Sequence, residues 1–328
     1  MRHFDYARAE SPQQAVAAHG SERDAAFLAG GTTLLDLVKL DVMQPQKVVD
    51  INGVDLDTIE RLDDGRLRIG AMVTNTALAR DERVVNDYAV LSQALLAGAS
   101  TQLRNKATTG GNVMQRVRCP YFRDGVSACN KREPGSGCAA IDGVNRTVHA
   151  VLGTSDNCIA THPSDMCVAM AAIGATVEVQ GPEGRREIDF ADFHLLPGDT
   201  PAREHALEPG ELITHVTLDA PLEGSRSAYL KLRDRQSYQF ALASSAVIVR
   251  MDGNTIREAR VAMGGVGTKP WRAPEVEAAL KGKVASEAVF AEAAKRAFEN
   301  AVAYSQNGYK IPLGQQAIVR NLTDLIAA

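Results

Sequence analysis

The sequence has no excess of positive charge, no long apolar run and no recognisable export signal. Its 328 residues include 36 Lys and Arg against 40 Asp and Glu, a formal net charge of -4, so we expect no basic surface for nucleic acid. No stretch reaches the roughly 20 apolar residues of a membrane span. Met1 to Tyr6 precede a polar helix rather than the apolar core of a secretory signal. These absences predict a soluble protein that binds no nucleic acid.

Closely paired cysteines are also missing. The chain has five cysteines, all in one region: Cys119, Cys129, Cys138, Cys158 and Cys167. Proteins that rely on disulfides are usually small, so an odd count in a chain of this length favours metal ligation. Without a C-x-x-C pair the spacing does not decide between zinc and an iron–sulfur cluster, because either can take four thiolates. Buried thiols without a metal are the third interpretation.

The segment that carries the first of these cysteines has no apolar periodicity. It runs from Gln115 to about Asn145, and a loop this long inside a compact domain is usually functional or disordered. The cysteines favour function, and Cys119 is followed by Pro120 as in bacterial iron–sulfur motifs. Cys167, by contrast, lies in an apolar helical run and is expected to be a core residue.

Two glycine turns indicate a ligand that bears phosphate. The apolar strand Ala25–Leu28 leads into Ala29–Thr33, with sequence AGGTT, before a helix begins. A second glycine turn, at Ala107–Asn112, has the similar sequence ATTGGN. Such turns expose backbone N–H groups at a helix N-terminus, and glycine lets a diphosphate approach closely. One turn alone is equally well explained as a plain tight turn, but two in one domain favour a phosphate-bearing cofactor.

A helix entry follows Pro163. Ser164 or Asp165 is the expected N-cap, and the carboxylate of Asp165 can equally accept a hydrogen bond from a ligand hydroxyl. Farther along the chain, Lys231 and Arg235 can neutralise phosphates, although solvated charge is the usual role of such residues. Four other histidines have no spacing typical of a metal or catalytic site and are predicted to be surface or packing residues: His149, His194, His205 and His215.

The second half of the chain divides at a polar stretch. Residues 175–188 read as a β-hairpin, residues 202–210 as an exposed loop, and Pro221 to Arg226 as the domain boundary. Beyond this boundary, a strand, a long hairpin at 244–263 and helices at 274–280, 286–303 and 314–327 predict a compact α+β domain of about a hundred residues.

Several motifs together resemble a known family. They are Ala29–Leu34, Ala107–Asn112, Pro163–Asp165, and Met263–Val266 followed by Pro270–Ala273. In this order they are similar to the FAD-binding medium subunit of the xanthine dehydrogenase family of molybdenum hydroxylases, over nearly the whole chain. The cysteine-bearing insert resembles that of the FAD subunit of bacterial periplasmic aldehyde oxidoreductase and, more distantly, of 4-hydroxybenzoyl-CoA reductase, which carry an additional 4Fe-4S cluster.

The resemblance implies an α+β fold: a two-lobed PCMH-type FAD-binding domain over residues 1–222, with a 4Fe-4S insert at about 115–160, and a smaller C-terminal domain over 226–328. Cys119, Cys129, Cys138 and Cys158 would ligate the cluster. The implied FAD-binding residues are Phe27, Leu28, Ala29, Gly30, Gly31, Thr32, Thr33, Leu34, Thr108, Gly111, Asn112, Asp165, Ile213 and Lys231.

The implied function is electron transfer in a molybdenum-dependent aldehyde oxidoreductase. A molybdenum-cofactor large subunit would oxidise an aldehyde to a carboxylic acid, a 2Fe-2S small subunit would pass electrons on, and FAD in this chain would deliver them to an external acceptor. Export of the assembled complex on a partner's signal would place it in the periplasm; residence in the cytoplasm is the alternative. Two other functions stay open, a stand-alone FAD-dependent oxidase and a structural or redox-sensing zinc module.

Overall fold

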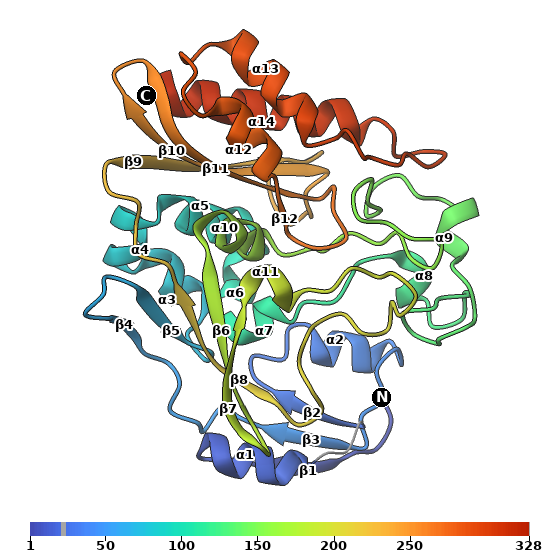
Figure 1. Cartoon of the computed structure of the whole chain (residues 1–328). Coiled ribbons are helices and arrows are strands. Elements are labelled where there is room, and N and C mark those ends of the chain that lie inside the picture. Colours follow the sequence, from blue (N-terminus) through green and yellow to red (C-terminus); the bar gives the residue numbers. More distant parts are fainter. Residues whose placement is uncertain (21–23, 328) are drawn as a thin grey trace.

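The protein, seen here as a computed structural model that describes residues 1–20 and 24–327, contains three sheets in successive layers (Figure 1). The first sheet is parallel, with order β1-β3-β2, and it pairs Tyr6 with Val48 and Val48 with Ala26. Its elements are β1 (Asp5–Arg8), α1 (Pro12–His19), β2 (Ala25–Leu28), α2 (Leu34–Lys39) and β3 (Lys47–Asp50). A small apolar core under this sheet includes Val49 and Ile51.

The second lobe is built on a five-stranded antiparallel sheet with order β4-β5-β8-β6-β7. Its strands are β4 (Ile59–Arg61), β5 (Leu67–Gly70), β6 (Ala175–Gly181), β7 (Gly184–Asp189) and β8 (Leu212–Leu218). Its helices are α3 (Asn75–Arg80), α4 (Glu82–Asp87), α5 (Ala89–Ala97), α6 (Thr101–Arg104), α7 (Thr109–Val113), α10 (Asp165–Ile173) and α11 (Phe190–Phe193). Strand β6 alternates buried and half-buried residues, as expected for a sheet with one face on the core.

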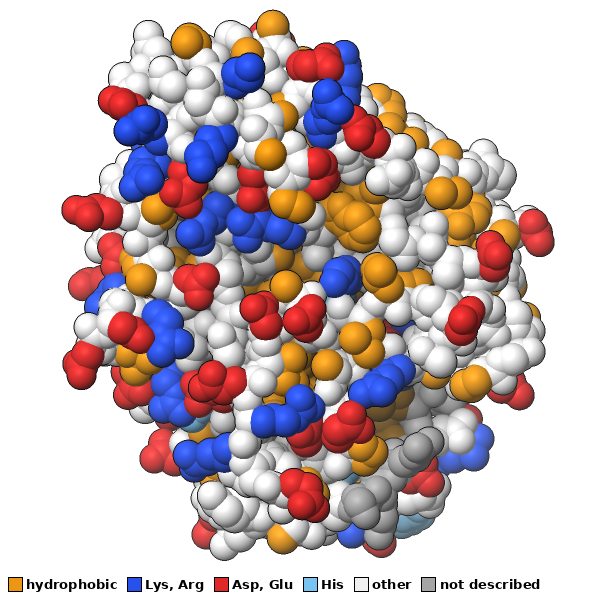
Figure 2. Space-filling model, viewed as in Figure 1, with side chains coloured by type: hydrophobic (Ala, Val, Ile, Leu, Met, Phe, Trp, Pro, Cys, Tyr) orange, Lys and Arg blue, Asp and Glu red, His pale blue; other side chains and the backbone are white. Residues whose placement is uncertain are grey.

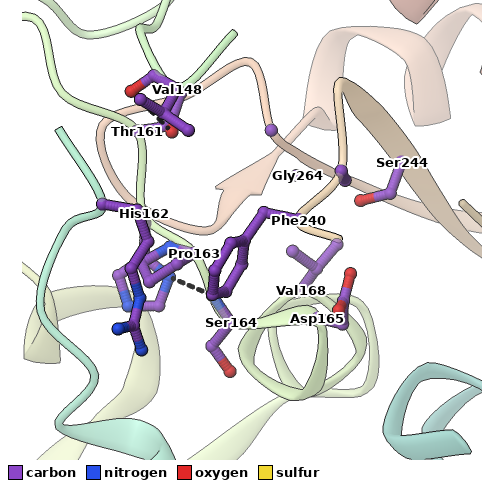
Figure 3. A pocket seen from close by; sticks show the side chains of 13 residues that line it. Val148, Thr161, His162, Pro163, Ser164, Asp165, Val168, Phe240, Ser244 and Gly264 are labelled. Carbon is purple, nitrogen blue, oxygen red and sulfur yellow. Dashed lines mark hydrogen bonds between the residues drawn. The ribbon is translucent and has the colours of Figure 1, made fainter. Parts of the chain in front are cut away.

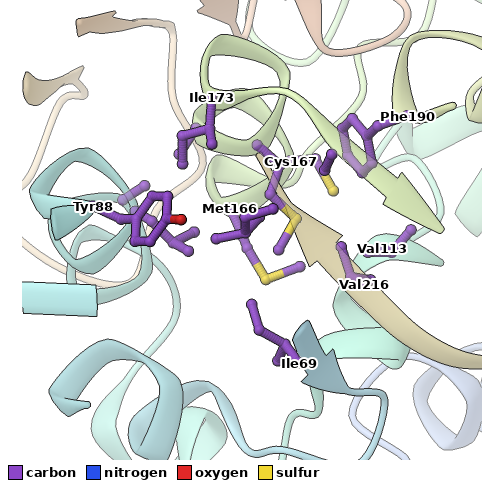
Figure 4. Packing of buried hydrophobic residues seen from close by; sticks show 14 of the residues in the cluster. Ile69, Tyr88, Val113, Met166, Cys167, Ile173, Phe190 and Val216 are labelled. Carbon is purple, nitrogen blue, oxygen red and sulfur yellow. The ribbon is translucent and has the colours of Figure 1, made fainter. Parts of the chain in front are cut away.

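The core of this lobe forms where α10 meets the sheet (Figure 4). Met166 and Cys167 point into it from α10, and Ile69 and Val216 come from the sheet. Cys167 is fully buried, and burial raises the pKa of its thiol to about 12. The prediction that Cys167 is a core residue is therefore confirmed.

The C-terminal domain is a four-stranded antiparallel sheet, order β12-β11-β10-β9, between two layers of helices. Its elements are β9 (Ser225–Leu232), β10 (Ala243–Asp252), β11 (Thr255–Gly264), β12 (Trp271–Arg272), α12 (Pro274–Leu280), α13 (Glu287–Arg296) and α14 (Lys310–Ala327). Helices α12 to α14 cover one face, and α5 and α10 of the second lobe contact the other (Figure 1). The helix predicted to end at residue 303 ends at Arg296, and the last helix begins earlier than predicted, at Lys310.

The cysteine-bearing insert contains only two short helices, α8 (Pro120–Arg123) and α9 (Ala139–Asp142), and lies to one side of the molecule (Figure 1). Its last part is hydrogen-bonded to the C-terminal domain. The backbone N–H of Gln306 donates to Asn145 Oδ1 at 2.9 Å, Asn307 Nδ2 donates to the Ala150 carbonyl at 3.0 Å, and the backbone N–H of Val302 donates to the Val151 carbonyl at 2.8 Å.

On the face shown in Figure 2, Lys and Arg side chains are interspersed with Asp and Glu, so this face has no extended region of one charge. None of the helices in the two described ranges combines the length and the apolar character needed to cross a bilayer.

Candidate functional site

The two glycine turns are in close backbone contact. In the first turn, Gly31 adopts φ 73°, a left-handed conformation that favours glycine. A Cβ on Gly30 would lie 1.8 Å from the carbonyl oxygen of Lys106, which directly precedes the second turn. The close backbone approach therefore requires glycine at position 30.

The second turn is held by its own cap and by the sheet. The Thr108 side chain accepts a hydrogen bond from the backbone N–H of Gly111 and caps α7. The backbone N–H of Gly110 donates to the Ala71 carbonyl at 2.9 Å, just past the end of β5. This arrangement fixes the turn against the second lobe while the first turn belongs to the first lobe.

A cavity of about 740 Å³ opens between the two turns and the loop that follows α11. Most of the predicted FAD-binding residues line it, namely Phe27, Ala29, Gly30, Gly31, Thr32, Thr33, Leu34, Thr108, Gly111 and Ile213. A cavity of this size is in the range of small-molecule and cofactor sites, which are about 300–1,000 Å³. Leu28, Asn112, Asp165 and Lys231 are absent from its wall among the described residues.

Asp165 and Lys231 form a buried ion pair instead. Their Oδ2 and Nζ atoms lie 2.8 Å apart, and the two side chains are 9% and 3% exposed. The Tyr229 hydroxyl donates to Asp165 Oδ1 at 2.6 Å. Asp165 thus joins α10 to β9 across the domain boundary, and it borders a small adjoining pocket with Ser164 and Phe240 (Figure 3).

Ser164, the residue before Asp165, is the N-cap of α10, and its side chain accepts from the backbone N–H of Cys167. The Ser164 hydroxyl also donates to Asn112 Oδ1 at 2.8 Å. Asn112 is buried by this contact and uses its amide group to tie the second turn to the start of α10.

Two histidines border the large cavity. His162 and His194 are in edge contact, with ring centroids 4.5 Å apart, and burial lowers the pKa of both, to about 4 for His194. His194 Nε2 contacts the Val113 carbonyl at 3.0 Å. Within the described residues, His162 Nε2 and His194 Nδ1 are buried and have no hydrogen-bond partner.

The four cysteines predicted to bind metal line one small cavity beside the large one. Cys129 and Cys138 face each other in a β-bridge, and Cys158 forms a bridge with Ser155. All four thiols are free of disulfides. Burial raises the pKa of Cys119 to about 12, with further contributions from Cys129 and Cys158. Thiols gathered in this way become favourable ligands when a bound cation neutralises their thiolate charge.

His149 lies directly against this cysteine cavity. Its Nε2 is 3.2 Å from Cys119 Sγ, and burial, with a smaller contribution from Lys310, lowers its pKa to about 4. A neutral imidazole can donate its Nε2–H to a thiolate. His149 was predicted to be a surface or packing residue, and it is buried. Its contact with a cysteine was missed, and the available signal was its position between Cys138 and Cys158.

A second group missed from the sequence is an ion-pair triad. Glu204 contacts Arg116 Nε at 2.5 Å with one oxygen and Lys131 Nζ at 2.9 Å with the other. Burial alone would raise the pKa of Glu204, but Arg116 and Lys131 hold it at about 2. The loop at 202–210 was predicted to be exposed; the Glu204 side chain is turned inward and only 18% exposed, so that prediction was wrong there.

Two family models match the chain in succession. Residues 2–221 match the FAD binding domain in molybdopterin dehydrogenase, and residues 227–321 match the CO dehydrogenase flavoprotein C-terminal domain. The chain therefore belongs to the FAD-binding medium subunits of the molybdenum hydroxylase family, and it is an oxidoreductase subunit. The resemblance and the α+β fold predicted from the sequence are confirmed.

Among individual relatives, the chain is 51% identical to the aldehyde oxidoreductase FAD-binding subunit PaoB of Escherichia coli, over 99% of this chain and 98% of that protein. It is 27% identical to the glyceraldehyde dehydrogenase medium chain of Sulfolobus acidocaldarius, over 85% of this chain and 82% of that one. Among solved structures, a carbon monoxide dehydrogenase chain from Hydrogenophaga pseudoflava superposes with a TM-score of 0.78 at 26% identity, covering 99% of this chain and 98% of that chain.

Proposed function

We propose that this chain is the electron-transfer subunit of a molybdenum-dependent aldehyde oxidoreductase, with FAD in the large cavity and a 4Fe-4S cluster on Cys119, Cys129, Cys138 and Cys158. One observation carries the proposal: the large cavity and the cysteine cavity share a wall, formed by Val117, Lys131, Cys158 and Ala160. Redox groups bound in two cavities that share lining residues would be close enough to exchange electrons. The likeness to an aldehyde oxidoreductase subunit supports the substrate class.

The chain's own groups fit a dinucleotide. The backbone N–H groups of Gly30 to Thr33 directly precede α2 and donate no backbone hydrogen bond among the described residues, so these donors are available to a diphosphate. His162 Nε2 and His194 Nδ1 add buried polar atoms that lack a partner among the described residues. When bound, FAD supplies a carrier that accepts electrons singly from iron–sulfur centres and passes them in pairs to an external acceptor.

The sulfur geometry supports an iron–sulfur cluster over zinc. Four thiolates around one zinc ion, each at about 2.3 Å, lie roughly 3.8 Å from one another. Among the described residues, no three of these four cysteines bring their sulfur atoms within 4.8 Å of one another. A cluster that separates its ligands more widely suits this spacing, and it agrees with the absence of a C-x-x-C pair.

Metal and flavin analysis tests the proposal. Chain purified anaerobically should contain about four irons and one FAD, and should be brown with flavin absorbance. Colourless protein with one zinc per chain would refute both cofactor assignments. Aldehyde turnover by the isolated chain would instead support the stand-alone oxidase, whereas we expect turnover only with the partner subunits.

The partners in this proposal are a molybdenum-cofactor large subunit and a 2Fe-2S small subunit, in a heterotrimer. Several relatives are named as medium chains, which supports a multi-subunit assembly. For localisation we propose the periplasm, reached by co-export with a signal-bearing partner. Fractionation of cells that express the whole complex tests this, and activity confined to the cytoplasm would contradict it.

A further inference from the structure

Lys131 is a buried cation in the wall between the two cavities. Its side chain is 8% exposed, and the residue lines both the large cavity and the cysteine cavity. Arg116 and Glu204, the other members of its triad, line only the large cavity. Lys131 is therefore the member of the triad that lies in the wall of the cysteine cavity.

The triad has one more positive charge than negative charge. Lys131 Nζ contacts Glu204 Oε1 at 2.9 Å and donates to the Pro201 carbonyl at 3.0 Å, while Glu204 Oε2 contacts Arg116. The carboxylate is fully ionised, so one cationic charge has no counter-charge within the triad. An uncompensated charge away from water is costly, which indicates that an anion belongs beside it.

Two anions are available in the proposed function, the FAD diphosphate and the tetrathiolate cluster. The position of Lys131 favours the cluster, because Lys131 shares the cysteine-cavity wall with Cys158. Lys131 is also only two residues from Cys129, which lines the same cavity.

We propose that Lys131 is the counter-charge that sets the reduction potential of the cluster, positioned by Glu204 and the Pro201 carbonyl. This inference rests on the proposed 4Fe-4S cluster. Reduction of the cluster by one electron without a proton would add one negative charge on the cysteine side of the wall. The ammonium stabilises the more negative reduced form and raises the midpoint potential, because charges interact strongly in a water-poor interior.

The test is a redox titration of the anaerobically purified full chain, followed by the EPR signal of the reduced cluster. Lys131→Met should lower the reduced-to-oxidised ratio at a fixed ambient potential at least tenfold, a midpoint shift of about 59 mV for one electron. Lys131→Arg keeps the charge and should stay close to wild type. Lys295→Met is the matched control, because it removes the same charge at a 62% exposed position.

Lys131→Met leaves the buried Glu204 carboxylate paired only with Arg116, which can destabilise the fold. A second variant therefore removes this carboxylate as well. The double variant Lys131→Met, Glu204→Gln removes a cation and an anion together. Glu204 does not line the cysteine cavity, so the double variant should also have a lowered midpoint, but by less than Lys131→Met.

Each outcome has a distinct meaning. If the wild-type chain contained no iron and gave no EPR signal, the cluster assignment would be refuted, and this inference with it. A normal wild-type cluster whose midpoint is unchanged in both Lys131→Met and the double variant would overturn the role of Lys131 alone. Loss of FAD from Lys131→Met with an unchanged cluster midpoint would also overturn it, and would assign the charge to the diphosphate.

Discussion

Replacing Gly30 with alanine should force the two glycine turns apart. The added Cβ would lie 1.8 Å from the Lys106 carbonyl oxygen, and one backbone must move by about 1.2 Å to reach even a 3.0 Å contact. Overpacking costs about 1–3 kcal/mol, and we expect the upper end, about 3 kcal/mol, because two backbones rather than a flexible side chain must yield. Both turns line the large cavity, so the strain also opposes closing them on FAD.

Two measurements check this prediction. Urea unfolding of the apo chain should show the lost stability, and FAD titration by flavin fluorescence should show a dissociation constant raised up to about 100-fold, since each 1.4 kcal/mol is about tenfold. Gly308→Ala is the control: its Cβ would meet only Ala303, at an ordinary 3.5 Å, and stability should change by less than about 1 kcal/mol. Wild-type stability and FAD affinity in Gly30→Ala would show that the turns are not in close contact.

Three further predictions concern buried groups. Burial lowers the pKa of Lys310 from 10.5 to about 7. The unfolded chain therefore binds the extra proton between these values, and stability should fall by about 1.4 kcal/mol per unit as pH drops from 10 to 7. Lys310→Met should remove this slope from urea midpoints, and an unchanged slope would count against the assignment. Asp165→Asn leaves Lys231 as an unpaired buried charge and should cost about 3–5 kcal/mol in thermal unfolding; an unchanged Tm would contradict the ion pair. Cys158→Ser should lose iron whereas Cys167→Ser keeps it, and equal iron in both would refute the ligand assignment.

Local patterns were the most predictable part of this protein. The glycine turns, the N-cap of α10 and the strands of the C-terminal domain depend on neighbouring residues, and the structure has them close to where the sequence predicts them. Ends of elements were less predictable. Residues 297–303 continue the composition of α13, yet the chain turns there because the backbone of Val302 pairs with Val151 of the insert.

Long-range partners could not be predicted from the sequence. Nothing near Glu204 shows that Lys131 and Arg116 will meet it, because these two come from the insert and Glu204 from the loop after α11. The same applies to Asp165: its carboxylate was a candidate ligand contact, but its pairing with Lys231 and Tyr229 depends on how β9 packs on α10. The cysteine spacing likewise left zinc and iron–sulfur equal, because it does not show how the folded insert brings the four sulfur atoms together.

The hydrogen bonds between the end of the insert and the C-terminal domain limit how this protein can be re-engineered. Asn145, Ala150 and Val151 satisfy backbone and amide groups of residues 302–307, and those groups would face a void if the insert were shortened to the length of a subunit without it. The insert therefore cannot be moved into another subunit by itself. Grafting it onto another medium subunit requires transplanting the matching segment before α14 as well, and the two segments are expected to change together in evolution.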